Sequence, residues 1–189
     1  MENYKKNLEL LTKNYVYSKE MEHDACGVGL IASTEGKKSR AVVEYGIEAL
    51  KAVWHRGAVD ADGKTGDGAG IHVEIPKDFF IEKIQVTGHD YDNSEICVGM
   101  IFLPRNDYSA QESCKTIVES ELTKNNFSIY GWRQVPVNPK VLGEKALQTM
   151  PEIIQVLFKS NDPNLLDKNL ERKIYETRKR IENKAFDAS

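Results

Sequence analysis

The stretch that most constrains this chain is an apolar run headed by a cysteine, Cys26-Gly27-Val28-Gly29-Leu30-Ile31, which follows a polar, lysine-rich segment. We interpret residues 1–25 as a leader and Cys26 as the first residue of the working protein. A cysteine at a chain terminus carries a thiol and an α-amine on one residue. With an unperturbed pKa of about 7.7–8.0, the amine is a far better base than lysine for taking the thiol proton near neutral pH. The alternatives are a buried core cysteine at the start of a strand and an ordinary N-terminal extension.

Length and composition are those of one soluble globular domain, with 189 residues of which 40% are hydrophobic and 29% charged. The formal net charge of −3 gives no reason to expect binding to nucleic acid or to an anionic membrane. No apolar run approaches the roughly 20 residues of a membrane helix, and the first residues lack the apolar core of a secretory signal. We therefore predict a cytoplasmic protein. Three cysteines (Cys26, Cys97 and Cys114) and four histidines lack the spacing of a disulfide framework or a metal site.

Strand-like and helical segments alternate along the chain, which predicts a layered α/β sandwich. We expect strands at residues 27–33, 71–75, 96–103, 127–137 and 152–159. We expect helices from a Ser39 cap to Trp54, at 77–85, at 109–124, and from Asp162-Pro163 onward. Residues 1–25 could form no more than a weak helix. The basic face of the last helix is interrupted by acidic residues, which favours a solvated surface over a nucleic-acid interface.

A glycine-rich segment, Asp60-Ala61-Asp62-Gly63-Lys64-Thr65-Gly66-Asp67-Gly68-Ala69-Gly70, precedes the expected strand at 71–75. Its four glycines predict positive φ angles or close approach of the backbone. A phosphate-binding loop is disfavoured, because the spacing is not that of a P-loop and a strand follows instead of a helix. The carboxylate of Asp67 would also repel phosphate.

Several segments together resemble the start of the class II glutamine amidotransferase domain. They are Cys26-Gly27-Val28-Gly29-Leu30-Ile31-Ala32, Glu48-Ala49-Leu50, His55-Arg56-Gly57-Ala58 and Thr65-Gly66-Asp67-Gly68-Ala69-Gly70-Ile71. The segments 131–138 (GWRQVPVN) and Leu142-Gly143 narrow the resemblance to the large subunits of glutamate synthases. The resemblance covers nearly all of the chain from Cys26 onward. It implies an N-terminal-nucleophile hydrolase, a mixed α/β (α+β) fold with an αββα sandwich that is incomplete in this chain. Residues 1–25 would be removed, and residues 26–189 would be the N-terminal part of the domain.

The resemblance also implies a reaction. The thiolate of Cys26 would attack the side-chain amide of L-glutamine, form a γ-glutamyl thioester and release ammonia, and water would then release glutamate. The α-amine of Cys26 would act first as base and then as acid. Arg56 would lie beside the nucleophile, and Gly27, Asp67 and Gly68 would bind substrate or shape a loop near the site. A structural role is the alternative for Asp67 and for His55.

The implied partners lie largely beyond these residues. No cofactor or metal is expected in this chain, whereas FMN and an iron–sulfur cluster are implied for the remainder of a full-length glutamate synthase. Ammonia would pass inside the protein to a flavin-bearing domain that aminates 2-oxoglutarate. The electron donor would be a small subunit or ferredoxin, and the sequence leaves NADPH, NADH and ferredoxin open as the source.

One departure from the family pattern concerns length. The family's oxyanion-hole Asn-Gly and the residues that grip the substrate's α-amino acid group fall beyond residue 189. Because losing one oxyanion donor costs about 10²–10³ in rate, we expect residues 1–189 alone to be inactive. The chain would then be the front part of a longer polypeptide, or a truncated remnant with a binding or regulatory role. An acyl-transfer or peptidase relative is a third alternative, which the 55–58 and 65–70 segments disfavour.

Overall fold

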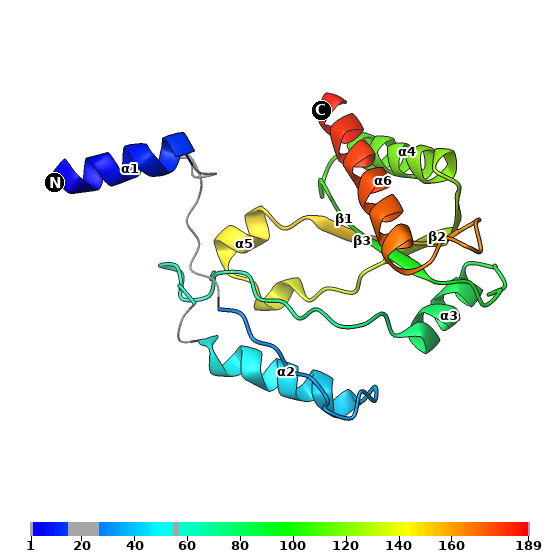
Figure 1. The fold of residues 1–189 in the computed structure, drawn as a ribbon, viewed down its shortest axis with the longest axis horizontal. Helices are drawn as coiled ribbons and strands as arrows, with labels where there is room; N and C mark the ends of the chain where they lie inside the picture. The colour runs from blue at the N-terminus through cyan, green and yellow to red at the C-terminus, as the bar shows by residue number, and fades with distance from the viewer. Residues whose placement is uncertain (1, 15–26, 55–56, 189) are drawn as a thin grey trace. The chain divides into compact units, whose positions relative to one another are not determined.

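The computed structural model of this chain describes residues 2–14, 27–54 and 57–188 (Figure 1). The chain divides into two compact units, Met1–Gly57 and Ala58–Ser189, which we call the N-terminal unit and the sheet unit. The predictions made for Cys26, His55 and Arg56, and for residues 1 and 15–25 of the leader, lie outside the described residues.

The described part of the N-terminal unit contains two α-helices, α1 (Glu2–Asn14) and α2 (Arg40–Ala52). Helix α2 begins as predicted, because the Ser39 hydroxyl accepts a hydrogen bond from the Ala41 N–H at 3.2 Å. The prediction of a buried strand at 27–33 is wrong for this structure. These residues pair with no strand, and Val28 and Leu30 are 93% and 89% exposed. An apolar run becomes a strand only when a neighbour accepts its backbone hydrogen bonds, and the described part of this unit supplies none.

The sheet unit is built on three antiparallel strands in the order β1-β3-β2 (Figure 1). They are β1 (Cys97–Leu103), β2 (Phe127–Gln134) and β3 (Glu152–Ser160). Phe158 of the central strand pairs with Cys97 on one side and with Ile129 on the other. The three strands confirm the predicted runs at 96–103, 127–137 and 152–159, each within three residues at its ends.

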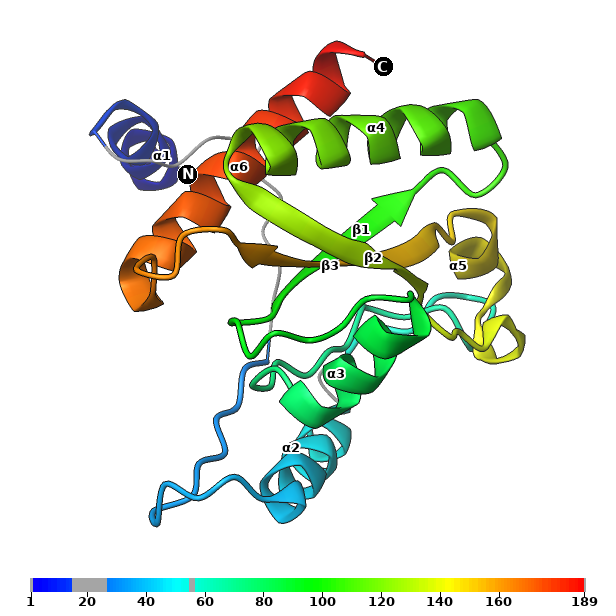
Figure 2. The ribbon, with the colours of Figure 1, turned by 90° about the vertical axis from the view of Figure 1, so that its right-hand side faces the viewer.

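Helices cover both faces of this sheet. Figure 2 shows α4 (Tyr108–Lys124) and α6 (Asp167–Asp187) on one side and α3 (Lys77–Val86) on the other. The core on the α4 and α6 side contains Cys97, Val118, Leu122, Phe127, Val156, Phe158 and Leu170. The core on the α3 side contains Phe80, Ile84, Ile96, Tyr130 and Leu157. The fold is therefore mixed α/β with a small antiparallel sheet, and the described residues hold no second multi-stranded sheet.

Two further expectations are corrected in this unit. The last helix begins at Asp167, because Asp162 starts a turn in which its carboxylate accepts from the Asn164 N–H at 2.9 Å. The expected strand at 71–75 is unpaired, and Ile71, Val73 and Ile75 are each more than a third exposed. Of the helices described, none combines the length and the apolar character needed to cross a membrane.

Candidate active site

Three of the five predicted site residues lie within the described part of the chain. Gly27 belongs to the N-terminal unit, and Asp67 and Gly68 belong to the sheet unit. A Cβ added to Gly27 would make an ordinary 3.9 Å contact with Val53, and one added to Gly68 would meet nothing within 4 Å. Cys26 and Arg56 are outside the described residues, so the structure defines the setting of the loop that follows Arg56.

That loop, residues 58–67, is closed at its base by Asp67, and we call it the docking loop. The Asp67 carboxylate accepts a hydrogen bond from the Ala58 N–H at 3.0 Å, and the Asp67 N–H donates to the Ala58 carbonyl at 3.3 Å. The neighbouring residues Val59 and Gly66 form an antiparallel β-bridge. The contacts seen for Asp67 are thus structural ones, which favours the alternative of a structural role.

The predicted need for glycine holds at two of the four positions in this segment. Gly63 has a φ of +68°, and a Cβ on Gly66 would lie 2.9 Å from the Ala58 carbonyl oxygen. Gly68 and Gly70 have neither a positive φ nor a near neighbour, so the expectation is wrong for them in this structure. Within the docking loop the backbone is crowded at Gly66 and has a positive φ at Gly63, and neither condition holds at Gly68 or Gly70.

Asp62 is the most heavily bonded side chain of the docking loop. One carboxylate oxygen accepts from the N–H groups of Lys64 at 2.9 Å and Thr65 at 2.7 Å. The other accepts from the Thr65 hydroxyl at 2.5 Å and from the Glu144 N–H at 3.0 Å. The Thr65 hydroxyl first, and then these backbone donors, hold the pKa of Asp62 well below its usual range. Asp62 therefore stays ionised and ties two distant segments together.

The second of these segments is the start of α5 (Glu144–Gln148), which follows the short helix η2 (Pro139–Val141). The Lys145 ammonium lies 2.6 Å from an Asp60 carboxylate oxygen. Gly143 is in such close contact that an added Cβ would collide with the Thr65 hydroxyl and the Asp62 carboxylate. The bond from the Lys64 N–H, two residues after Asp62, is that of an Asx turn, and Asp62-Gly63-Lys64 is a local sequence signal for it. No local signal connects Asp62 or Thr65 to Gly143.

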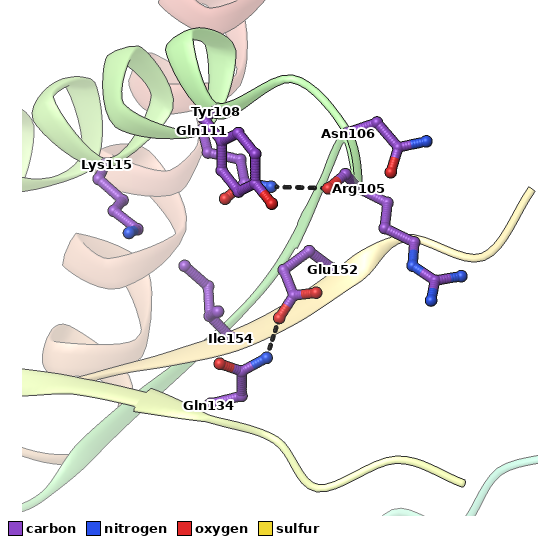
Figure 3. A pocket seen from close by; sticks show the side chains of 8 residues that line it. All are labelled: Arg105, Asn106, Tyr108, Gln111, Lys115, Gln134, Glu152 and Ile154. Atoms are coloured by element: carbon purple, nitrogen blue, oxygen red, sulfur yellow. Dashed lines mark hydrogen bonds between the residues drawn. The ribbon is translucent and has the colours of Figure 1, made fainter. Parts of the chain in front are cut away.

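A separate pocket of about 520 Å³ lies where α4 begins and the strands end (Figure 3). Its lining is Arg105, Asn106, Tyr108, Gln111, Lys115, Gln134, Glu152 and Ile154. Several of its polar groups already bind protein: the Gln111 amide donates to the Pro104 carbonyl at 2.7 Å, and Gln134 donates to Glu152. Ligand pockets are usually lined mainly by apolar side chains, and Ile154 is the one apolar aliphatic group here. Of the predicted site residues that the structure describes, none lines this pocket.

The other thiols and the acidic groups offer no competing centre among the described residues. Burial, and to a smaller extent the charges of Glu95 and Glu171, raises the pKa of the Cys97 thiol to about 12. The thiol therefore stays protonated near neutral pH and cannot act as a nucleophile. Cys114 is half-buried on α4. Within residues 2–14, 27–54 and 57–188, no three His, Cys, Asp or Glu side chains gather as metal ligands would.

Comparison with known proteins places these features in a family. The family model for class II glutamine amidotransferases matches residues 26–189, so its first matched residue is Cys26. The chain is 53% identical over 179 residues to the glutamate synthase [NADPH] large chain of Azospirillum brasilense, covering 95% of this chain and 12% of that protein. It is 40% identical over 174 residues to the ferredoxin-dependent glutamate synthase of Pyropia yezoensis, covering 92% of this chain and 11% of that protein. The chain spans 12% or less of the length of these relatives. It belongs to the class II glutamine amidotransferase family.

Proposed function

We propose that this chain supplies the glutamine-hydrolysing part of a glutamate synthase, with Cys26 as the nucleophile. The observation that carries the proposal is a family match that begins at Cys26, together with 53% identity to a glutamate synthase large chain across 95% of these residues. Of the three thiols, Cys97 is excluded by its raised pKa and its burial.

In the proposed reaction the α-amine of Cys26 takes the thiol proton, and the thiolate attacks the side-chain carbonyl carbon of L-glutamine. The carbon–nitrogen bond breaks as the α-ammonium returns its proton to the leaving ammonia. Water then attacks the γ-glutamyl thioester, with the α-amine again as base, to give glutamate and the free thiol. Arg56 would lie beside the nucleophile and hold it in place. Gly27 and the loop that contains Asp67 and Gly68 would form the nearby walls.

This mechanism requires that residues 1–25 are removed, since only then is the amine of Cys26 free. The fold that we propose is the αββα sandwich of N-terminal-nucleophile hydrolases, in which the observed sheet is one of two. The support for a further layer is the exposure of Val28, Leu30 and Ile71, because a soluble domain gains stability by burying such side chains.

We also propose that the ammonia aminates 2-oxoglutarate in a larger protein. The names of the relatives include NADPH in one case and ferredoxin in the other. For this protein, FMN and an iron–sulfur cluster would be held by segments outside residues 1–189, and reducing electrons would come from a small subunit or ferredoxin. Residues 26–189 would supply the nucleophile for glutamine hydrolysis and take no part in the amination.

The test is Cys26→Ser in the natural-length product of the gene that encodes this chain, assayed by ammonia release from glutamine. We expect a fall of several orders of magnitude, because an alkoxide is much harder to generate than a thiolate. Cys97→Ser and Cys114→Ser are the matched controls and should alter stability more than rate. Near-native ammonia release by Cys26→Ser would overturn the proposal. Intact mass gives a second outcome, since an active protein that still begins at Met1 would contradict the proposed use of the α-amine.

A further inference from the structure

We propose that the pocket shown in Figure 3 binds an acidic α-amino acid, a ligand with one ammonium group and two carboxylates, such as L-glutamate or L-aspartate. We call it the α4 pocket, since it lies where α4 begins. Its volume of about 520 Å³ is within the range of roughly 300–1,000 Å³ that is usual for small-molecule sites. All of its lining residues belong to the sheet unit, and none of them takes part in the proposed hydrolysis of glutamine.

Side chains of opposite charge line the α4 pocket without pairing. Arg105 and Glu152 both line it, yet neither forms an ion pair with any residue that the structure describes. The Glu152 carboxylate accepts a hydrogen bond from the Gln134 amide, which carries no charge. A carboxylate and a guanidinium each gain most from a hydrogen-bonded partner of opposite charge. A ligand that carries both an ammonium and a carboxylate supplies both partners at once.

Gln111 adds an acceptor to the wall of the pocket. Its side chain is held in place, because the residue is 8% exposed and its amide nitrogen donates to the carbonyls of Pro104 at 2.7 Å and Arg105 at 3.2 Å. Since both amide hydrogens are used in this way, the amide oxygen points away from these carbonyls. No described residue donates to that oxygen, and it is not sealed from solvent. Glu152 and Gln111 therefore offer two acceptors to an ammonium, which has three hydrogens to donate.

The pocket has two cationic side chains and one carboxylate. The Lys115 ammonium lies 2.8 Å from a carboxylate oxygen of Glu112, but the Glu112 side chain is 72% exposed, and such surface pairs contribute little. Lys115 can therefore bind a carboxylate of the ligand, while Arg105 binds the other with two parallel N–H groups. A ligand with one ammonium and two carboxylates has a single net negative charge. That charge balances the single net positive charge of Arg105, Lys115 and Glu152 together.

The rest of the lining favours an amino acid over a simple anion. Figure 3 shows the α4 side chains on one side of the pocket and Glu152 with Gln134 on the other. An inorganic phosphate or a plain dicarboxylate would place negative charge near Glu152 without a cation to offset it. Ile154, which is 7% exposed, supplies one apolar surface for the short methylene chain of an acidic amino acid. A larger apolar ligand would find no further aliphatic side chain in this lining.

Acetylation of Lys115 by acetic anhydride can report occupancy of the α4 pocket in the natural-length protein, with peptide mass as the readout. L-Glutamate and L-aspartate should slow this acetylation in a saturable way, because a bound carboxylate covers the ammonium. Acetylation of Lys77 and Lys168, which are exposed and lie outside the pocket, should not change. Arg105→Gln and Glu152→Gln should each raise the L-glutamate concentration for half-maximal protection by about tenfold or more, because each removes a hydrogen bond between charged groups.

Glutarate, which is glutamate without the ammonium, tests whether Glu152 recognises a cation. It should protect Lys115 more weakly than L-glutamate does, and Glu152→Gln should not weaken that protection. The matched control is Arg180→Gln, at an exposed arginine of α6 outside the pocket, which should leave protection by L-glutamate unchanged. Should Glu152→Gln fail to fold, Arg105→Gln, at an exposed position, carries the test.

Three results would each overturn the proposed amino-acid site. The first is that neither amino acid protects Lys115. The second is that glutarate protects it as well as L-glutamate does. The third is that the half-maximal concentration of L-glutamate is the same in Arg105→Gln and Glu152→Gln as in the unsubstituted protein.

Discussion

Replacing Gly131 by alanine should destabilise the sheet unit through two separate effects. Gly131 follows a β-bulge in β2, where the register with β3 shifts between Ile129 and Gly131, and its φ is +151°. An added Cβ would lie 2.7 Å from the Thr87 methyl carbon and 2.9 Å from its Cβ. Thr87 cannot simply move away, because its hydroxyl donates to the Tyr130 carbonyl at 2.8 Å. Alanine therefore meets both an unfavourable backbone conformation and a fixed neighbour.

The magnitude follows from adding the two effects. A non-glycine residue in such a sparsely populated conformation costs on the order of 1–3 kcal/mol. Crowding a well-packed site by an extra methyl group typically costs another 1–3 kcal/mol or so. Together they predict a loss of about 2–6 kcal/mol, a large share of the roughly 5–15 kcal/mol that stabilises a typical domain.

Urea unfolding followed by tryptophan fluorescence can measure this loss. Trp132 packs against the core beside Gly131, whereas Trp54 is 72% exposed and should report little. Two other glycines separate the backbone effect from the crowding effect. Gly88 has a φ of +83°, but a Cβ added there would meet no atom within 4 Å. Gly99 has no positive φ, but a Cβ added there would lie 2.8 Å from a Val156 methyl carbon.

We expect Gly131→Ala to cost more than either Gly88→Ala or Gly99→Ala. Adding Thr87→Ser, which deletes the crowding methyl group and keeps the hydroxyl, should restore part of the loss. The reasoning is refuted if Gly131→Ala costs no more than Gly88→Ala, or if Thr87→Ser restores nothing.

Three further predictions concern the core, the acid stability and the thiols. Leu157 is fully buried in the central strand, and Leu157→Ala should lower the free energy of unfolding by about 2–5 kcal/mol. Phe102 is 63% exposed, and Phe102→Ala should lower it by less than half as much. Hydrogen bonds from Lys159 and, to a smaller extent, from Ser94 hold the pKa of Asp92 well below its usual value near 4. Ionised Asp92 therefore stabilises the fold above about pH 4, and this contribution is lost as the pH falls. The urea midpoints of the unsubstituted protein and Asp92→Asn should therefore converge as the pH falls from about 5 to about 2, where carboxylates titrate. A difference between the two midpoints that stays constant over this range would contradict the prediction. In the native protein, iodoacetamide at pH 8 should label the buried Cys97 at least about tenfold more slowly than Cys114. In the unfolded protein the two thiols should be labelled at equal rates, as peptide mass can measure.

Segments whose structure depends on nearby residues could be predicted from the sequence. Helix α3 follows Pro76 and ends at Val86, one residue beyond the expected end. Strand β1 ends at Leu103 because Pro104 cannot donate a ladder hydrogen bond. The Ser39 cap likewise depends on a backbone donor two residues away. In each case, the decisive atoms lie within a few positions of one another along the chain.

Segments whose structure depends on distant partners could not be predicted in this way. The runs at 27–33 and 71–75 have the apolar character of strands, but a strand also needs a neighbour to bond its backbone, and composition does not supply one. The start of α6 differs from the predicted start at Asp162 for another reason. The Asp162 carboxylate can cap a helix or close a turn, and here it bonds to Asn164 and delays the helix to Asp167.

The docking loop explains why two separate parts of the family resemblance belong together. Thr65 begins the segment 65–71 and Gly143 ends the segment 142–143, and no local pattern in the sequence connects the two. In the structure the Thr65 hydroxyl and the Asp62 carboxylate occupy the space that a Cβ on residue 143 would need. A side chain at residue 143 would therefore displace the carboxylate that accepts from the Glu144 N–H. Gly143, in the connection between β2 and β3, therefore contacts the same loop whose base is closed by the hydrogen bonds between Asp67 and Ala58.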